Sequence, residues 1–217
     1  MARGKQAKRM IRTVEGTRVV RKRDLVAVEE PLEIQLRAGG DRRVIAITMR
    51  TPGNDYELAA GFLYTEAIVS AKPEIDHMIY CVDGETMLQE YNALAVSLRT
   101  GALPELPGLD RHFFTNSACG VCGRTMLDEL DERQLPPLDE NLVVAPDALT
   151  ALPAALRQAQ QIFDTTGGLH AAALFTQTGE LLALREDVGR HNALDKLIGW
   201  GLLQGRLPFS DKIILVS

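Results

Sequence analysis

Two cysteines separated by two residues are the chemically sharpest feature of this 217-residue sequence, in the run TNSACGVCG at 115–123. Two thiols at this spacing can chelate a metal, close a small disulfide, or act as a nucleophile and its neighbour. Each of these uses requires a thiolate. Gly120 and Gly123 let backbone N–H groups approach the sulfur, and a predicted helix that starts at Arg124 adds positive charge. These surroundings favour the thiolate of Cys119, with Cys122 as the second thiol.

Two other uses of the cysteines stay open on the residues alone. A structural zinc site would have to recruit isolated histidines, because the sequence has no second C-x-x-C pair and no H-x3–5-H pair. A dithiol redox site of the thioredoxin kind needs a strand just before the motif, and prolines break the preceding segment 101–110. Zinc deaminase chemistry is excluded, since Ala172 stands where H-x-E would place glutamate after His170. The third cysteine, Cys81, lies in a strand pattern and is predicted to be buried and inert.

Charged and polar residues gather at a second place, the turn that leads into a predicted helix over 193–203. The first turn of a helix attracts phosphate, so one interpretation is an anionic, phosphate-bearing ligand. The other is a capped helix in which Asp187 and Asn192 satisfy backbone groups and Lys196 pairs with a carboxylate. Taken alone, His170 is typical of a packed core histidine. The candidate ligand-binding residues, from this turn and the glycine-rich segment before it, are Gly168, His170, Asp187, Gly189, Arg190, His191, Asn192 and Lys196.

The elements that must position these groups indicate a layered α/β or α+β domain. Strands are predicted over 25–28, 32–36, 43–49, 77–81, 87–98, 169–175, 181–184 and 212–216. Helices are predicted after the break at 51–55, over 146–163 and over 193–203. A tight turn is predicted at 38–41. Because proline is tolerated in the first turn of a helix, Pro153 places the start of the second helix near Leu152.

Four segments follow from this arrangement. We expect a basic flexible arm at 1–24, an N-terminal β-rich subdomain with one helix at 25–110, a cysteine loop at 111–130 and an α/β core at 131–217. The last strand stands directly at the end of the sequence, where natural domains rarely finish, so we expect the core to be truncated at its C-terminus.

The charge of the chain is divided unevenly. Residues 1–23 hold nine Lys or Arg and one acid, a net of +8, whereas the rest holds 15 basic and 28 acidic residues, a net of −13. A loose, solvated leader is the simplest interpretation, and contact with nucleic acid or an acidic partner is the other. The body has no basic stripe or aromatic platform, so we expect no nucleic-acid partner. No apolar run is long enough to cross a membrane, we expect no secretory signal, and three cysteines favour a reducing cytoplasm.

Several long blocks, in order, make this chain similar to the FdhD/NarQ family of sulfur carrier proteins required for formate dehydrogenase activity. They are EEPLEIQL (29–36), MRTPGNDYELAAGFLYTEAIV (49–69), TNSACGVCG (115–123), TGGLHAAALF (166–175), EDVGRHNALDKLIGW (186–200) and DKIILVS (211–217). The resemblance runs from about residue 25 to the end. Ala67 is a departure from it, at a position where the family pattern leads us to expect glycine.

The resemblance implies a fold and a chemistry. The core should resemble the cytidine deaminase fold. Cys119 should carry a persulfide received from a cysteine desulfurase, with Cys122 as the second family thiol, and pass its sulfur to the molybdenum cofactor in its bis-molybdopterin guanine dinucleotide form. That would make the protein a sulfurtransferase-type carrier with the cofactor as bound substrate, and with no metal or permanently bound cofactor. Its partners would be the desulfurase, formate dehydrogenase and a second copy in a homodimer. A C-terminal segment beyond Ser217 would help to hold the guanine dinucleotide.

Overall fold

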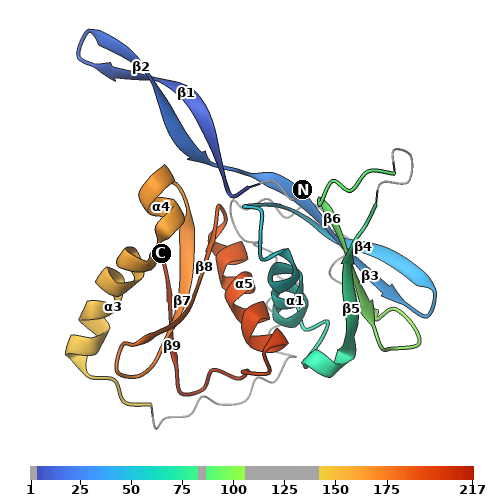
Figure 1. The fold of residues 1–217 in the computed structure, drawn as a ribbon. Coiled ribbons are helices and arrows are strands. Elements are labelled where there is room, and N and C mark those ends of the chain that lie inside the picture. The colour runs from blue at the N-terminus through green and yellow to red at the C-terminus, as the bar shows by residue number, and fades with distance from the viewer. Residues whose placement is uncertain (1–3, 83–86, 106–141) are drawn as a thin grey trace, which may run out of the picture.

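Three separate sheets organise the part of the chain that the computed structural model describes, which is residues 4–82, 87–105 and 142–217 (Figure 1). The first is a hairpin of β1 (Gln6–Glu15) and β2 (Arg18–Ala27). The second has four strands in the order β4-β3-β6-β5, and the third has three in the order β8-β7-β9. The class is therefore mixed α/β with several small sheets.

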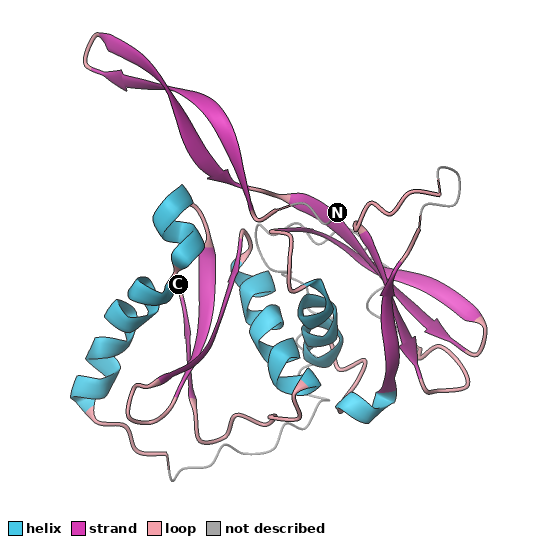
Figure 2. Ribbon diagram, in the orientation of Figure 1, coloured by secondary structure: helices cyan, strands magenta, loops and turns pink. Residues whose placement is uncertain are grey.

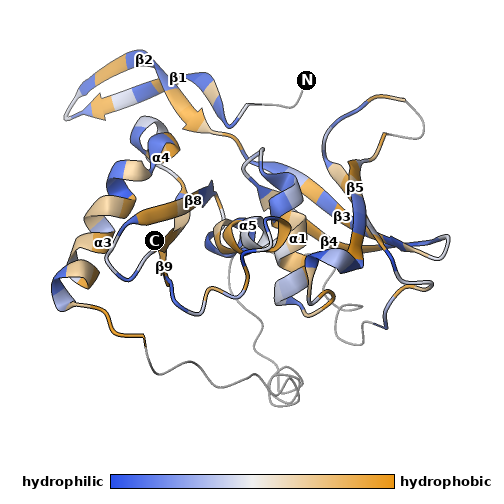
Figure 3. Ribbon diagram, turned by 60° about the horizontal axis from the view of Figure 1, so that its bottom comes forward, coloured by the Kyte–Doolittle hydropathy of each residue, from blue (hydrophilic) through white to orange (hydrophobic). Residues whose placement is uncertain are grey.

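The N-terminal residues form an ordered hairpin rather than the loose arm expected at 1–24. Every residue of β1 pairs with β2 in antiparallel register, from Gln6 opposite Ala27 to Glu15 opposite Arg18. The turn contains Gly16 at φ 61, a left-handed conformation that glycine adopts without strain. Both strands mix basic and apolar residues, which give the hairpin its blue and orange bands in Figure 3, without a regular period of two.

The four-stranded sheet confirms most of the local predictions and adds a long-range pairing, although the strand expected over 87–98 begins only at Ala93. Its strands are β3 (Glu30–Ala38), β4 (Asp41–Arg50), β5 (Ile75–Tyr80) and β6 (Ala93–Leu98), with a 3₁₀ turn η1 (Lys72–Glu74) before β5. The predicted turn joins β3 to β4 through Gly39 and Gly40, both at positive φ. β5 and β6 pair antiparallel, whereas β6 lies parallel to β3. Local patterns could not indicate this parallel pair, because its strands are far apart in sequence.

The three-stranded sheet contains β7 (His170–Phe175), β8 (Leu181–Asp187) and β9 (Ile213–Val216), all antiparallel. The predicted hairpin of β7 and β8 is confirmed. Ile214 and Val216 of β9 are 40% and 39% exposed, because β9 lies at the edge of this sheet in the described structure.

Two helices lie between the sheets. α1 (Asp55–Thr65) packs on the four-stranded sheet and α5 (Arg190–Leu203) on the three-stranded one, and the two helices pack on each other. α3 (Pro146–Ala159) and the short α4 (Gln161–Thr166) lie on the far side of the three-stranded sheet, as Figures 1 and 2 show. Each central helix follows the last strand of a β-hairpin, β4 for α1 and β8 for α5. The layered interpretation of the sequence is thus confirmed.

The crossing of α1 and α5 depends on two glycines in matching positions. A Cβ atom at Gly61 would lie 1.8 Å from the carbonyl oxygen of Asp195, and one at Gly199 would lie 1.8 Å from that of Glu57. Gly61 stands four residues after Glu57 in α1, and Gly199 stands four residues after Asp195 in α5. Each helix therefore offers a glycine and a carbonyl one turn apart, and the two contacts are reciprocal. Backbones this close leave no room for a side chain at either position.

Two local backbone features concern the start of α3, which differs from the prediction, and the conformation of Ala67. α3 begins at Pro146, not near Leu152, and contains Pro153 in its interior. The helix tolerates this because the carbonyl that loses its partner belongs to Leu149, which is 47% exposed and can bind water. Ala67, where the family pattern has glycine, adopts φ 58, a conformation that favours glycine.

Candidate functional site

Asp187, at the end of β8, is fully buried and organises the turn into α5. Its carboxylate accepts a hydrogen bond from the backbone N–H of Gly189 at 3.0 Å, and one from the N–H of Thr51 at 3.0 Å. The Thr51 hydroxyl in turn accepts from the N–H of Val188 at 3.1 Å. The turn before α5 is therefore hydrogen-bonded directly to the turn before α1. The two hairpin–helix units, β3-β4-α1 and β7-β8-α5, share one polar centre.

Lys196 supplies the counter-charge in this centre. Its side chain is 1% exposed, and Nζ lies 2.6 Å from Asp187 Oδ2 and 2.8 Å from the carbonyl oxygen of Thr51. Burial lowers the pKa of the Lys196 amine, and the Asp187 carboxylate opposes that shift. The amine faces inward, toward groups of its own chain. This contact is the one that the capped-helix interpretation predicts for Lys196.

Asn192 completes the polar centre from the first turn of α5. Its Nδ2 donates to Asp187 Oδ1 at 3.1 Å and to the carbonyl oxygen of Met49 at 2.8 Å, and its Oδ1 accepts from the Thr48 hydroxyl at 3.3 Å. Met49 and Thr48 belong to β4, so α5 is joined to the opposite sheet. Asp187 and Asn192 thus satisfy backbone groups, as the capped-helix interpretation has it.

A second buried ion pair stands at the matching turn before α1, and sequence reasoning missed it. Arg50 and Asp55, 1% and 2% exposed, form a two-bond pair with distances of 3.1 and 2.9 Å. The Tyr80 hydroxyl also donates to Asp55, at 2.9 Å, and burial raises the pKa of that phenol. The available signal was an arginine and an aspartate on either side of a Thr-Pro-Gly-Asn turn in an otherwise apolar stretch.

The other candidate residues lie on the surface around the same turn. Arg190 and His191, in the first turn of α5, are exposed, and so are Gly168 and His170. His170 pairs with Asp187 across β7 and β8, which brings the glycine-rich segment beside the turn. The His170 ring also contacts the backbone oxygen of Ser217, with Nδ1 at 2.8 Å. The exposure of His170 contradicts the packed-core interpretation of this residue.

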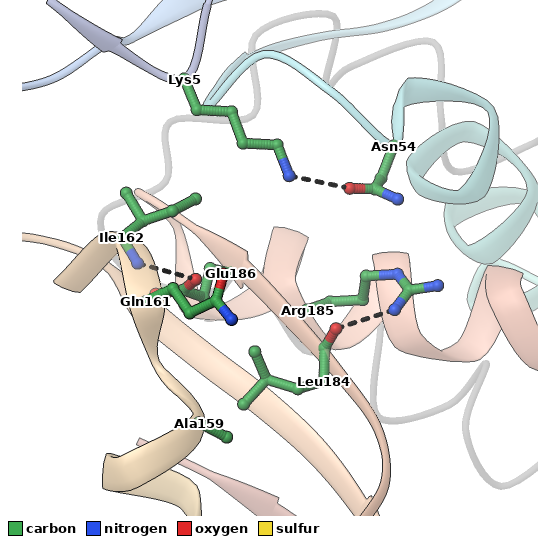
Figure 4. Close-up of a pocket in the computed structure, with 8 residues that line it drawn as sticks. All are labelled: Lys5, Asn54, Ala159, Gln161, Ile162, Leu184, Arg185 and Glu186. Atoms are coloured by element: carbon green, nitrogen blue, oxygen red, sulfur yellow. Dashed lines mark hydrogen bonds between the residues drawn. The ribbon is translucent and has the colours of Figure 1, made fainter. Parts of the chain in front are cut away.

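A pocket of about 390 Å³ opens near this surface, between β8, the start of α1 and the base of the hairpin. Its lining residues, shown in Figure 4, are Lys5, Asn54, Ala159, Gln161, Ile162, Leu184, Arg185 and Glu186. None of the predicted site residues is among them. The predicted residue Asp187 directly follows the lining residue Glu186 in sequence, but its side chain is buried.

Most charges in this pocket are already compensated. The Glu186 carboxylate accepts from the backbone N–H groups of Ile162 and Phe163 at 3.3 and 3.1 Å. Arg185 pairs with Glu57, with Nη2 2.7 Å from Oε1. Lys5 donates to Asn54 Oδ1 at 3.3 Å and has no acidic partner among the described residues. The pocket is therefore lined mainly by polar side chains, with Ala159, Ile162 and Leu184 as its apolar residues.

Asp195, on the face of α5 that meets α1, has a carboxyl group whose pKa is strongly raised. Burial raises its pKa to about 7, and the nearby acids Glu66 and Asp187 add to the rise. The Thr65 hydroxyl, which donates to Oδ1 at 3.1 Å, opposes it. The contact depends on Gly61, because only a glycine lets α1 approach the Asp195 backbone this closely.

Asp195→Asn should therefore remove a pH dependence. With a folded pKa near 7 against about 4 in the unfolded chain, the native state binds the extra proton between these values, so Asp195 makes the free energy of unfolding fall as pH rises from 4 to 7. Denaturant titrations should show the variant gaining about 2–3 kcal/mol on the parent protein between pH 5 and pH 8. A constant difference between the two proteins at both pH values would contradict this assignment.

The predicted reactive cysteines, Cys119 and Cys122, lie outside the described residues, so their roles stay predictions. Cys81 is half-buried, and its sulfur accepts from Arg37 Nη2 at 3.4 Å. In the described ranges no three His, Cys, Asp or Glu side chains lie together in a way that would hold a metal ion. No helix in those ranges is long and apolar enough to cross a bilayer.

The profile of the FdhD/NarQ family matches residues 27–217, which is most of the chain and includes both hairpin–helix units. The chain belongs to the FdhD/NarQ family. Within this family it is similar to proteins named sulfur carrier protein FdhD. The one from Mycolicibacterium paratuberculosis is 47% identical over 97% of this chain and 76% of the relative. The one from Sulfolobus acidocaldarius is 42% identical over 89% of this chain and 68% of the relative.

A solved structure supports the fold of this FdhD/NarQ family member. The crystal structure of a protein from Desulfotalea psychrophila, described as a formate dehydrogenase accessory protein, superposes with a TM-score of 0.71. The superposition covers 98% of this chain and 75% of the Desulfotalea chain, and the two sequences are 22% identical. At this identity the likeness concerns the fold alone.

Proposed function

We propose that this FdhD/NarQ family member is a sulfur carrier that supports the activity of a formate dehydrogenase. The observation that carries the proposal is the 47% identity, over 97% of the chain, to a relative named for sulfur carriage. The C-x-x-C run at 115–123 supplies thiols that such a carrier requires. A zinc module or a dithiol redox protein would use the same cysteines. Stoichiometric zinc would indicate the former, and reversible loss of two thiols on mild oxidation the latter.

In the loading step, the thiolate of Cys119 attacks the terminal sulfur of a cysteine persulfide on a donor desulfurase. A sulfur–sulfur bond forms at Cys119 Sγ while the sulfur–sulfur bond of the donor breaks, and the donor cysteine leaves as a thiolate. The sulfur is transferred at the same oxidation level, so no external oxidant is needed. A glycine-flanked position for Cys119 suits a sulfur that must meet two different partners.

In the delivery step, the persulfide sulfur passes to molybdenum in bis-molybdopterin guanine dinucleotide, which the protein binds as substrate. Cys122 has two routes to contribute. It either displaces hydrosulfide from the Cys119 persulfide, closing a Cys119–Cys122 disulfide that a thiol must later reduce, or positions the persulfide while an external thiol attacks Cys119 Sγ, releases the same hydrosulfide and leaves a mixed disulfide that a second thiol reduces. The cofactor, the donor and cytoplasmic location are parts of the proposal, as are a homodimer and the likeness of residues 131–217 to cytidine deaminase.

For the phosphate groups of this substrate we propose the exposed start of α5. The Arg190 guanidinium can donate two parallel hydrogen bonds to a phosphate, and the His191 ring can donate another. The backbone N–H groups of the first helical turn add the positive end of the helix dipole. Gly168 and His170 border the same surface through the pairing of β7 with β8. Asp187, Asn192 and Lys196 act from beneath, where they fix the direction of the turn. Lys196 is thus a positioning residue in this proposal, because its amine is fully engaged inside the protein.

Restoring formate dehydrogenase activity in a bacterium that lacks its own family member tests this function. We expect the protein to restore formate-dependent dye reduction and Cys119→Ala to leave the extract at the level of the untransformed strain. Arg190→Ala should lower the restored activity by about tenfold, the loss expected for one charge-assisted hydrogen bond to phosphate.

Cys81→Ala is the matched control, since it removes a thiol on the four-stranded sheet, outside the proposed site. It should retain nearly the full activity, at equal protein levels on an immunoblot. Full activity of Cys119→Ala would refute the sulfur-carrier function, whereas full activity of Arg190→Ala would refute only the phosphate site.

A further inference from the structure

The hairpin of β1 and β2, here called the hairpin arm (residues 6–27), projects from the body of the protein (Figure 1). Its two strands form a sheet of their own, and in the described ranges neither pairs with a strand of the body. Val14 and Val19, next to its tip, are 64% and 59% exposed. An isolated two-stranded hairpin is only marginally stable in water, so a partner that covers the arm would stabilise it.

The base of the hairpin arm adjoins the end of the body that carries the proposed phosphate site. The Gln6 side chain donates to the hydroxyl of Thr165 in α4, just before the glycine-rich segment, and β2 packs on α4. Lys5, the residue before β1, lines the pocket of Figure 4 together with Arg185 and Glu186, which precede the turn into α5. A macromolecule that approaches the start of α5 therefore comes close to the arm.

One face of the hairpin arm is purely basic and apolar. Residues opposite each other in an antiparallel pair share a face, and every second pair lies on the same one. The pairs on this face, here called the basic face, are Lys8–Leu25, Met10–Arg23, Arg12–Arg21 and Val14–Val19. All of these residues except Leu25 are exposed. Arg12 stands directly opposite Arg21, and like charges in this arrangement destabilise a hairpin unless a negative group lies over them.

The opposite face of the hairpin arm has acids of its own. Glu15 stands opposite Arg18 and Asp24 opposite Arg9, and Lys22 Nζ lies 3.9 Å from Asp24 Oδ2. The basic residues of the basic face, in contrast, form no ion pair with any acid in the part of the chain that the structure describes. The demand for negative charge is therefore confined to the basic face.

The charge of the chain and the apolar residues of the basic face indicate the class of partner. Nucleic acid and anionic membranes are extended polyanions, and they would also meet the remainder of the chain, whose net charge of −13 repels them. A phosphate backbone would in addition leave Met10, Val14 and Val19 without apolar contact. Methionine and arginine are enriched in interfaces between proteins. A protein surface with a local acidic patch beside apolar residues fits both features.

We propose that the hairpin arm docks its basic face on an acidic patch of the protein that accepts the substrate bound at the start of α5. This inference rests on the proposed function, under which that acceptor is a formate dehydrogenase. The phosphate-bearing substrate leaves from the start of α5, so its acceptor must approach the end of the body where the arm stands. The arginines of the basic face attract and orient the acceptor, and its methionine and valines supply apolar contact.

Binding of the full-length chain to the purified, cofactor-free formate dehydrogenase whose activity it restores tests the proposal, by biolayer interferometry at low and high salt. We expect a complex that weakens as salt rises. Arg12→Gln with Arg21→Gln should raise its dissociation constant by at least about 100-fold, since two charge-assisted contacts are lost. The matched control is Arg9→Gln with Lys22→Gln, which makes the same change in net charge on the opposite face and should raise the constant by less than about tenfold.

Hydrogen exchange of the backbone amides of the arm separates docking from folding. Arg12→Gln with Arg21→Gln removes the repulsion between facing arginines, so the free variant should exchange no faster than the parent protein although it binds more weakly. Faster exchange in this variant alone would show that the arm unfolds and would overturn the assignment of these arginines to docking.

Three other results would overturn the proposal. They are a parent protein that does not bind the cofactor-free enzyme, an equal loss of binding in both double variants, and arginine-dependent binding of a cysteine desulfurase, a 20-base-pair DNA duplex or phosphatidylserine vesicles in place of the enzyme. Sulfur loading keeps this failure apart from failure of the proposed function. Both double variants should load sulfur like the parent protein, so a parent that loads sulfur without binding the enzyme through its arm refutes the docking surface alone.

Discussion

Lys196→Met should lower the free energy of unfolding by about 3–5 kcal/mol, the usual cost of leaving one partner of a buried ion pair without the other. Asp187 is fully buried, so its carboxylate cannot turn to water when the amine 2.6 Å away is lost. The carbonyl oxygen of Thr51 also loses its donor. Urea titration followed by circular dichroism measures the change.

The double variant Lys196→Met with Asp187→Asn separates charge from packing. It removes the stranded carboxylate while an amide oxygen still accepts from the N–H groups of Thr51 or Gly189. We therefore expect it to be more stable than the single variant by about 1–3 kcal/mol. GDP mimics the nucleotide half of the proposed substrate. If Lys196→Met unfolds like the parent protein and instead weakens binding of GDP, Lys196 reaches the ligand and its structural role is wrong.

Gly199→Ala should be nearly as damaging, through sterics alone. The new methyl group would lie 1.8 Å from the carbonyl oxygen of Glu57 and 2.6 Å from the backbone nitrogen of Gly61, and neither backbone atom can rotate away. The helices must separate, which costs about 3 kcal/mol or more, well above the gain of about 1 kcal/mol that alanine brings to a helix. The melting temperature and the urea midpoint should both fall.

Gly168→Ala is the control, because a Cβ atom there meets nothing within 4 Å and the backbone φ is not positive. It should change the free energy of unfolding by less than about 0.5 kcal/mol. Gly61→Ala should repeat the loss seen at 199, since the two glycines make reciprocal contacts. A stable Gly199→Ala protein would show that α1 and α5 are further apart in solution.

Much of the body could be predicted from local patterns, because its strands and helices carry their own signals. The paired glycines at 39–40 and the helix after the break at 51–55 lie where the sequence indicates them. The hairpin at 6–27 was missed because its charge is typical of a solvated arm. The interior proline of α3 was missed because local rules place proline in the first turn, and an exposed carbonyl relaxes that rule.

The candidate site was predictable in part. The turn between β8 and α5 was predicted, and the structural interpretation of Asp187, Asn192 and Lys196 was one of the two that the sequence left open. Thr51 was not found, although it binds both ends of that turn, because its partners lie about 136 residues away. Long-range contacts of this kind leave no local pattern. The fold that they hold together presents Arg190 and His191 on one surface.

Intact mass after sulfur loading tests the central claim most directly. The protein is incubated with a cysteine desulfurase and L-cysteine and then weighed. We predict one added sulfur atom that a thiol reductant removes, its loss in Cys119→Ala and its retention in Cys81→Ala. A protein that gains no sulfur and holds one equivalent of zinc would contradict the account, and so would one whose Cys119→Ala variant still gains the sulfur atom.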